Sequence, residues 1–573
     1  MNNRLVRLVF PDSDSFLSPS FYEEKYPLRD LPAGAMVTRF APSPTGSMHI
    51  GGIYASLINK KLAEQSGGVF FLRIEDTDTK RYQEGTIRTI IDGLHRFGLP
   101  PDEGVIGLEN GTVVERGDYG PYIQSNRVKI YHTFTAHLMR LGHAYPCFCT
   151  EEDLENQRII QREQKVTRFG YYGKWAKCRQ LSFDEAAERL RRGFPFVIRL
   201  RAVGDYEKRI VWEDYIKGSI SMPEYDHDIV LLKRDGIPTY HLAHVVDDHF
   251  MRTTHVIRAD EWVSSVPLHL QLFRLFSWAP PAFGHFAPIE KIETVQEIDA
   301  EGREVTRESR RKLSKRKDAE ANIDFYAEMG FPEEATIEYL ANLFDSSFEP
   351  WRDKNPEAPL ESFRFTPGSL AAHGALSDVV KIASISKDII ARMDSETVYQ
   401  KALNWAREFD PELAGLMAKY PDYTRRALDI ERTGEGAGKR IRTWKDLRPQ
   451  LAYMFDELFA HQNHFEFPEN MTPEEIKTVL RRFLELYDEK DEAWFERVKE
   501  ITREIGFAES MGAFKKAKGA LRGHVGDVAM VLRVALCGSR QSPDLRSVML
   551  VMGRERVTRR LSHDFTKEKN TSR

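Results

Sequence analysis

The chain has 573 residues, of which 30% are charged and 41% are hydrophobic, and its formal net charge is -4 at pH 7. This length exceeds what one hydrophobic core supports, so we expect several domains of ordinary globular composition, and the charge excludes a uniformly basic protein. Four cysteines are too few for a secreted disulfide scaffold, no apolar run approaches the roughly 20 residues that span a membrane, and the first residues lack signal-peptide features. We therefore expect a cytoplasmic protein.

After an N-terminal extension of unassigned role, residues 1–34, the first motif is RFAPSPTGSMHIGG at residues 39–52. Apolar residues at helical spacing follow it, and VFFL at residues 69–72 is typical of a strand buried on both faces. The order strand, glycine-rich elbow, helix and strand predicts a βαβ unit, in which ligands bind beyond the carboxyl ends of the strands. Free N–H groups at the helix N-terminus suit a phosphate, and His49 could donate to it; the alternative is a tight turn with a surface histidine.

About 110 residues then separate this unit from a second α/β-like stretch, DIVLLKR and HVIRADEW, at residues 228–234 and 255–262. The intervening block is predicted to be an insertion with its own helices, one of which begins with a capping box of Ser182 and Glu185. From about residue 331 onward strand signals nearly vanish. MTPEEIKTVLRRFLELY, for example, predicts a helix with Thr472 as N-cap and Glu475 closing the capping box.

The second candidate for chemistry is RESRRKLSKRK at residues 307–317, which has seven basic side chains and one acid. A run of this kind is usually a solvated or generally polyanion-binding loop. Lys312 and Lys315, however, flank Leu313 and Ser314 in a loop-like setting, which suits a mobile clamp on phosphates. The elbow and this loop together are more specific than either alone.

Four motifs in order, RFAPSPTGSMHIGG, FLRIEDTDTKR, TYHLAHVVDDHFMRTTHVIRADEW and KLSKRK, resemble the glutamyl-tRNA synthetases, and LRVALCGSRQSPDL and MGRERVTRRL resemble the end of the bacterial-type members. These enzymes belong to class I of the aminoacyl-tRNA synthetases. The resemblance implies an α/β fold with a Rossmann-type catalytic domain, an inserted acceptor-binding domain and a mainly α-helical anticodon-binding region. It also implies ATP and Mg²⁺ as cofactors, and the formation of glutamyl-adenylate before transfer to tRNA(Glu).

The resemblance also implies roles for individual residues. His49, Lys312 and Lys315 would be catalytic. The implied ATP site comprises His49, Gly51, Gly52, Glu261, Trp262, Lys312 and Lys315. The implied glutamate pocket comprises Arg39, Ala41, Ser43, Glu75, Tyr240 and Arg258. Among these, Arg258 is the better candidate for the side-chain carboxylate, because a guanidinium fork matches a carboxylate and leaves a neutral amide poorly matched.

Some relatives bind zinc in the inserted block, and Cys147, Cys149 and Cys178 match three of their ligands. Gln180 stands where a histidine ligand is expected, so a closed tetrahedral site is doubtful unless Tyr172 or His143 completes it.

The predicted domains are 1–34, extension; 35–115 and 228–290, the two halves of the catalytic domain; 116–227, insertion; 291–375, stem-contact region; and 376–573, helical region. A glutaminyl-tRNA synthetase and an inactive tRNA-binding paralogue remain as alternatives, although intact signatures disfavour the second. The implied partners are glutamate and tRNA(Glu), with tRNA(Gln) as a further candidate. A monomer is the family expectation.

Overall fold

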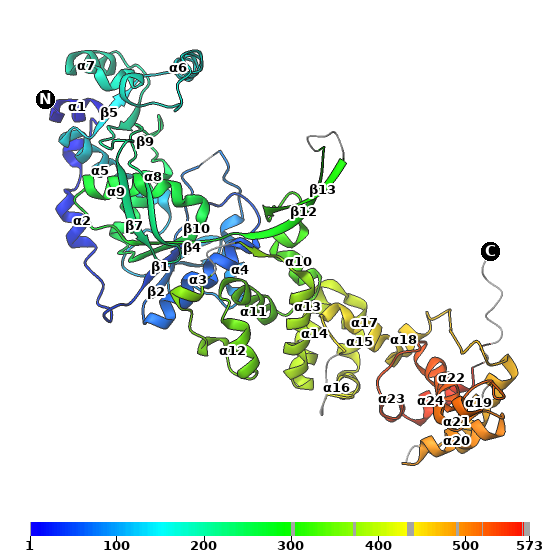
Figure 1. Cartoon of the computed structure of the whole chain (residues 1–573). Coiled ribbons are helices and arrows are strands. Elements are labelled where there is room, and N and C mark those ends of the chain that lie inside the picture. Colours follow the sequence, from blue (N-terminus) through cyan, green and yellow to red (C-terminus); the bar gives the residue numbers. More distant parts are fainter. Residues whose placement is uncertain are drawn as a thin grey trace. The chain divides into compact units, whose positions relative to one another are not determined.

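The computed structural model describes residues 2–78, 80–298, 304–370, 374–432, 440–488, 492–517, 519–563 and 565 (Figure 1). Thr79, within the second motif, therefore lies outside the described residues. The chain divides into two compact units. The first comprises Met1–Phe325 and Ile337–Asp378, and the second comprises Tyr326–Thr336 and Val379–Arg573.

The first unit contains the predicted βαβ unit. Strand β1 (Val37–Phe40) pairs in parallel with β2 (Val69–Leu72), and helix α3 (Ile50–Ser66) connects them and packs on this sheet (Figure 1). Gly67 ends α3 in a left-handed conformation, as expected of a glycine after a helix. The sheet has the order β1-β2-β3-β4. Its other elements are β3 (Glu103–Glu109), β4 (Thr112–Arg116) and the preceding helix α4 (Thr86–Arg96).

A second four-stranded sheet continues from β1. Its order is β10-β11-β7-β8, and Thr254, just before β10, donates its N–H to the carbonyl of Val37 at 3.1 Å. The strands and the two helices that flank β10 are β7 (Arg209–Asp214), β8 (Gly218–Pro223), β10 (His255–Ala259), β11 (Ala282–Phe286), α8 (Tyr240–Phe250) and α9 (Val266–Leu275). Because β10 and β11 are parallel to each other, their carboxyl ends lie at the same edge.

Sheet membership differs from the sequence expectation at two places. DIVLLKR was expected with the second half of the catalytic domain, but its strand β9 (Val230–Leu232) pairs antiparallel with β6 (Val197–Leu200), which also pairs with β5 (Ala144–Cys147). Conversely, β7 and β8 lie within the expected insertion, yet β7 pairs with β11. Pairing between strands distant in the sequence depends on tertiary packing, which local hydrophobicity does not report.

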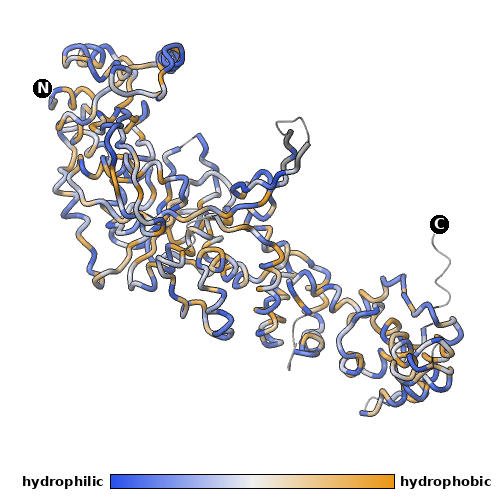
Figure 2. The backbone as a smooth tube through the Cα atoms, in the orientation of Figure 1, coloured by the Kyte–Doolittle hydropathy of each residue, from blue (hydrophilic) through white to orange (hydrophobic). Residues whose placement is uncertain are grey.

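The inserted block also contains the predicted helices. They are α5 (Val128–Leu141), α6 (Glu151–Glu163) and α7 (Phe183–Arg191). The capping box of Ser182 and Glu185 at α7 is confirmed. Figure 2 shows that α6, placed as in Figure 1, consists mostly of hydrophilic residues, in agreement with its largely exposed side chains.

The N-terminal extension is an ordered part of the first unit. It forms α1 (Asn2–Val9) and α2 (Pro19–Lys25). The Glu23 carboxylate accepts from Arg252 at 2.8 Å, and Arg29 forms an ion pair with Glu103 at 2.9 Å. These contacts fix the extension on elements that follow it by more than 70 residues in the chain.

A long hairpin leads into the lysine-rich loop. It consists of β12 (Ile289–Ile298) and β13 (Glu304–Lys312), and Leu313, which follows it, is 2% exposed and donates its N–H to the carbonyl of Ile289 at 2.9 Å. The buried leucine anchors a loop whose neighbouring lysines stay accessible. The remaining elements of this region are α10 (Ile323–Glu328), α11 (Glu333–Phe344), α12 (Phe348–Lys354) and β14 (Ala375–Leu376).

Beyond β14 the described residues form helices and no strands, as the sequence predicts. Thr472 caps α19, Glu475 completes the capping box, and Ile476, Val479, Leu480 and Phe483 are buried. None of the helices in the described ranges is long and apolar enough to cross a bilayer. The helices are α13 (Val379–Arg392), α14 (Ser395–Phe409), α15 (Pro411–Lys419), α16 (Pro421–Asp429), α17 (Leu447–Leu451), α18 (Asp456–Phe459), α19 (Pro473–Leu486), α20 (Trp494–Glu504), α21 (Met511–Lys516), α22 (Val525–Cys537), α23 (Leu545–Met552) and α24 (Arg554–Leu561).

Candidate active site

A cavity of about 870 Å³ lies in the first unit, at the carboxyl ends of β1 and β10. It is lined by segments of all four motifs, which are up to about 270 residues apart in the chain. Twelve of the thirteen residues predicted for the ATP and glutamate sites line it: Arg39, Ala41, Ser43, His49, Gly51, Gly52, Glu75, Tyr240, Arg258, Glu261, Trp262 and Lys312. Lys315 is the exception, but its ammonium group donates to the carbonyl of Ser47, two residues before His49.

His49 is the N-cap of α3. Its Nδ1 accepts the N–H of Gly51 at 2.8 Å, so in the neutral ring the proton is on Nε2. Burial, together with the charges of Lys315 and Lys312, lowers the pKa of His49 to about 4. At neutral pH the imidazole is therefore an uncharged hydrogen-bond donor at a helix N-terminus, where anions bind favourably.

A buried aspartate, Asp318, stabilises the loop after β13 through hydrogen bonds. Asp318 accepts from both terminal nitrogens of Arg311, at 2.6 and 2.8 Å, and from the N–H of Ser314 at 2.9 Å. The hydrogen bonds from Arg311 lower the pKa of Asp318, so the carboxylate is ionised. Lys312 reaches the other wall of the cavity and pairs with Glu261 at 2.5 Å, while both side chains stay about half exposed. An exposed pair of this kind is weak and exchanges readily for a stronger anion.

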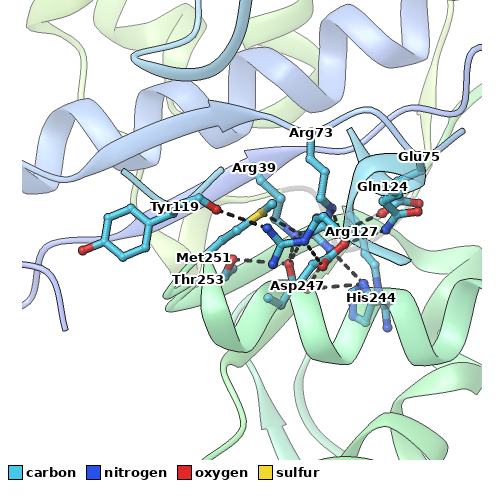
Figure 3. A network of polar contacts seen from close by, with 12 residues as sticks. Arg39, Arg73, Glu75, Tyr119, Gln124, Arg127, His244, Asp247, Met251 and Thr253 are labelled. Atoms are coloured by element: carbon cyan, nitrogen blue, oxygen red, sulfur yellow. Dashed lines mark hydrogen bonds and ion pairs between the residues drawn. The ribbon is translucent and has the colours of Figure 1, made fainter. Parts of the chain in front are cut away.

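Behind the cavity lies a buried network of three arginines and three carboxylates (Figure 3). Arg73 donates to Asp248 at 2.7 Å and to Glu75 at 2.9 Å, and Arg127 donates to Asp247 at 2.6 Å. Asp247 also accepts from Gln124 and Tyr131, at 2.9 and 2.8 Å. Because each buried charge has an opposite partner, the network can exist without water, and removal of one partner would leave an uncompensated charge.

Two members of this network face the cavity. Arg39 contacts Asp248 through Nε at 3.3 Å and Nη2 at 3.4 Å, so the buried carboxylate fixes its plane. Glu75 accepts from Arg73 through Oε1, and burial raises the pKa of this carboxyl group. The cavity thus presents one guanidinium and one carboxylate side by side, the complement of an amino acid's carboxylate and ammonium groups.

Arg258 is a second cation in the wall, and its surroundings differ. Its side chain donates to Nε2 of His285 at 3.0 Å, to the Tyr240 hydroxyl at 3.1 Å and to the carbonyl of Trp262 at 3.2 Å. Burial lowers the pKa of Arg258, and no carboxylate in the described parts of the chain forms an ion pair with it. A guanidinium that is 7% exposed and bound only to neutral groups strongly favours an anionic ligand.

Three thiols gather in the inserted block. The sulfurs of Cys147, Cys149 and Cys178 lie within 4.8 Å of one another, and the hydroxyl of Tyr171 is 3.4 Å from the sulfurs of both Cys147 and Cys149. The sequence left the fourth ligand open and named Tyr172 and His143 as candidates. The hydroxyl of Tyr172 donates to the carbonyl of Arg168, and the neighbouring tyrosine takes the place beside the thiols. Three thiols this close together are a candidate zinc site, and the tyrosine hydroxyl is the fourth polar group beside them.

Sequence reasoning missed the residues behind the cavity wall. Asp247 and Asp248 are adjacent acids within the helical segment HLAHVVDDHF. Acids that follow apolar residues in a helix are a sign of buried charges, which need partners, and this was the one available signal. Arg127, Asp214 and His285 had no signal, because each lies in a separate segment outside the motifs.

Two protein-family models match successive parts of the chain. The model described as the class I tRNA synthetases (E and Q), catalytic domain, matches residues 35–349, and the model described as an anticodon binding domain matches residues 398–564. The chain belongs to the class I tRNA synthetases of the E and Q type.

The names of individual relatives specify the amino acid. The chain is 51% identical over 570 residues to a glutamate–tRNA ligase of Sorangium cellulosum, covering 97% of this chain and 100% of that protein. It is 44% identical to a glutamate–tRNA ligase of Clostridium perfringens, covering 97% and 99%. A crystal structure of a glutamate tRNA ligase from Elizabethkingia meningosepticum in complex with its amino acid superposes with a TM-score of 0.70 at 27% identity, covering 92% of this chain and 99% of the other.

Proposed function

We propose that the chain is a glutamate–tRNA ligase, which activates L-glutamate with ATP and transfers it to the terminal adenosine of tRNA(Glu). The single observation that carries the choice of amino acid is Arg258, a buried guanidinium on the cavity wall with only neutral partners. The relatives named glutamate–tRNA ligase over nearly the full chain support the same assignment.

The cavity offers a group for each charge of glutamate. Arg39 would bind the α-carboxylate and Glu75 the ammonium group, with Ala41 and Ser43 beside them, while Arg258 and Tyr240 would bind the side-chain carboxylate. Glutamine has the same shape but a neutral side chain, so it would leave Arg258 buried without a counter-charge. This mismatch disfavours the alternative of a glutaminyl-tRNA synthetase.

In the first half-reaction, an oxygen of the glutamate α-carboxylate attacks the α-phosphorus of ATP, and the bond to the β-phosphate breaks to release pyrophosphate. His49, through Nε2–H, would donate to the α-phosphoryl oxygens as charge develops there. Lys312 and Lys315 would neutralise the departing pyrophosphate, and Gly51 and Gly52 would let the phosphates approach the start of α3. Glu261 and Trp262 would hold the nucleotide. When bound to the phosphates, Mg²⁺ supplies further charge neutralisation.

In the second half-reaction, a ribose hydroxyl of the terminal adenosine attacks the acyl carbon, and AMP leaves. We assign the inserted block, predicted at 116–227, to acceptor-stem binding, residues 291–375 to stem contacts and residues 376–573 to anticodon binding. Of the predicted boundaries of the catalytic halves, 35–115 and 228–290, we amend two: β7 and β8 go with the catalytic part because β7 pairs with β11, and the segment from Asp228 to β9 goes with the inserted block because β9 pairs with β6. We also propose a cytoplasmic monomer. Whether tRNA(Gln) is a second substrate depends on anticodon contacts and is decided by charging each tRNA separately.

We propose a structural zinc ion on Cys147, Cys149, Cys178 and Tyr171. The ligands come from β5, the residues just after it, a loop and the short 3-10 helix Lys177–Gln180, so the ion would tie together segments with little hydrophobic core of their own.

Glutamate-dependent exchange of pyrophosphate into ATP, measured with tRNA(Glu) present, tests the proposed function. We expect exchange with glutamate and at least about 100-fold less with glutamine, the loss typical of leaving a buried charge unpaired. No exchange under these conditions would favour the inactive tRNA-binding paralogue, and equal exchange with glutamine would refute the assigned role of Arg258.

A further inference from the structure

Two buried residues that do not line the cavity lie directly behind Arg258. Its Nε donates to Nε2 of His285 at 3.0 Å, and Nδ1 of His285 lies 2.5 Å from Oδ2 of Asp214. The strand register explains the contact, because Arg258 on β10 and His285 on β11 are direct partners of the parallel pair. The side chains of His285 and Asp214 are fully buried.

The direction of each hydrogen bond is determined by chemistry. A guanidinium only donates, so Nε2 of His285 must be unprotonated and the ring proton must be on Nδ1, from which it is donated to Asp214. Asp214 cannot turn away, since its other oxygen, Oδ1, accepts the N–H groups of Ile216, Lys217 and His285 at 3.0 to 3.1 Å. The carboxylate therefore selects the histidine tautomer, and the tautomer provides the acceptor for Arg258.

A neutral ring between the two charges has a consequence that a direct ion pair would not have. If Asp214 contacted Arg258 itself, the guanidinium would be neutralised and would attract a substrate carboxylate less. With His285 in between, Arg258 is oriented while its charge remains unneutralised by a contacting carboxylate. Burial lowers the pKa of His285, which keeps the ring neutral.

We propose that Asp214 and His285 are positioning residues for glutamate recognition, which hold the Arg258 guanidinium in the orientation that binds the side-chain carboxylate of the substrate. The inference rests on the proposed function. It attributes the specificity for glutamate to three hydrogen-bonded side chains on adjacent strands, Arg258 on β10, His285 on β11 and Asp214 on β7. The simpler reading, a polar contact that only stabilises the sheet, predicts a loss of stability and no selective effect on glutamate binding.

The decisive variant is Asp214→Asn. Oδ1 must still accept the three backbone N–H groups, so the new amide group points its NH₂ at His285. The ring then has to accept at Nδ1 and carry its proton on Nε2, where it opposes the Nε–H of Arg258. The substitution keeps the volume of the side chain almost unchanged, and it replaces no residue of the cavity wall. His285→Gln retains an acceptor near the position of Nε2, whereas His285→Leu removes it.

The test measures KM for glutamate, KM for ATP and kcat by pyrophosphate exchange with tRNA(Glu) present, together with the melting temperature. We expect Asp214→Asn and His285→Leu to raise KM for glutamate about 10- to 100-fold, the loss typical of a hydrogen bond to a charged group, with KM for ATP unchanged. His285→Gln is expected to stay within about threefold of wild type by the same reasoning. Asp228→Asn, a buried aspartate replaced in the inserted block, is the matched control and is expected to leave KM for glutamate unchanged.

Unchanged KM for glutamate in folded Asp214→Asn would overturn the proposal, as would equal increases of KM for glutamate and ATP. If Asp214→Asn does not fold, the comparison of His285→Gln with His285→Leu tests the proposal. Equal KM values for glutamate in these two variants would refute it. Failure of the proposed function is distinct, because wild-type protein would then show no glutamate-dependent exchange at all.

Discussion

His49 caps α3 and is proposed to act in catalysis, and a pair of substitutions can distinguish these two roles. Its Nδ1 caps α3 by accepting the N–H of Gly51 at 2.8 Å, and its Nε2–H is proposed to donate to the α-phosphoryl group. His49→Ala removes both interactions. His49→Asn keeps an acceptor of the right reach for the cap but has no donor at the position of Nε2, and asparagine is among the preferred N-cap residues.

The two roles have different magnitudes. Loss of an N-cap costs about 1 kcal/mol of stability, within a range of roughly 0.5 to 2 kcal/mol. Loss of one preorganised donor at a developing charge costs about 2 to 4 kcal/mol of transition-state stabilisation, which is about 30- to 900-fold in rate. We therefore expect both variants to lose 30- to 900-fold in pyrophosphate exchange, and only His49→Ala to unfold at lower urea concentration.

The measurements are pyrophosphate-exchange kinetics, in which one substrate concentration is varied at a time, and urea unfolding of the same preparations. KM for glutamate is expected to change little, because His49 faces the nucleotide side of the cavity in the proposed assignment. A His49→Asn variant with near wild-type exchange would refute the catalytic role of Nε2–H. Equal unfolding midpoints for His49→Ala and wild type would refute the contribution of the cap.

Three further predictions concern other parts of the first unit. Lys315→Ala is expected to lower exchange by about 2 to 4 kcal/mol of transition-state stabilisation with tRNA affinity unchanged, and a near-normal rate would contradict its role on pyrophosphate. Tyr171→Phe is expected to weaken zinc retention against a chelator, whereas Tyr172→Phe is not; equal zinc content of the two purified variants would exclude Tyr171 as a ligand. The pKa values of His49 and His241 are lowered from 6.5 to about 4, mainly by burial, so the unfolded chain binds more protons between these values. Stability is therefore expected to fall as the pH decreases below about 6.5, by about 1 kcal/mol for each ring at pH 5.5, and the double substitution to Gln should reduce this fall in urea titrations.

Local structure followed from local sequence in several segments. The helix at 473–486 formed where Thr472 and Glu475 supply the capping box, and α3 ended at Gly67 where the chain needs a left-handed residue. These outcomes depend on residues within one turn of each other, so the short-range pattern contains the whole signal. The strand of DIVLLKR was also recognisable, but its partner was not, because β6 lies about 30 residues earlier in the chain.

The motifs also identified the residues that line the cavity, and twelve of the thirteen lie there. Their roles remain predictions. The sequence did not identify Tyr171, since no spacing rule distinguishes it from Tyr172, and the geometry of the loop alone brings its hydroxyl to the thiols.

The sequence by itself determined the family, the order of the motifs and the kinds of charge that the site would present. Only the tertiary structure decided how those charges are held: that Arg39 and Glu75 are fixed by a buried network, and that Arg258 is oriented by a neutral histidine rather than neutralised by an acid. The physical reason is that a side chain's charge is a property of its residue type. Its orientation and burial depend on neighbours from distant segments, which come together only when the strands take their register.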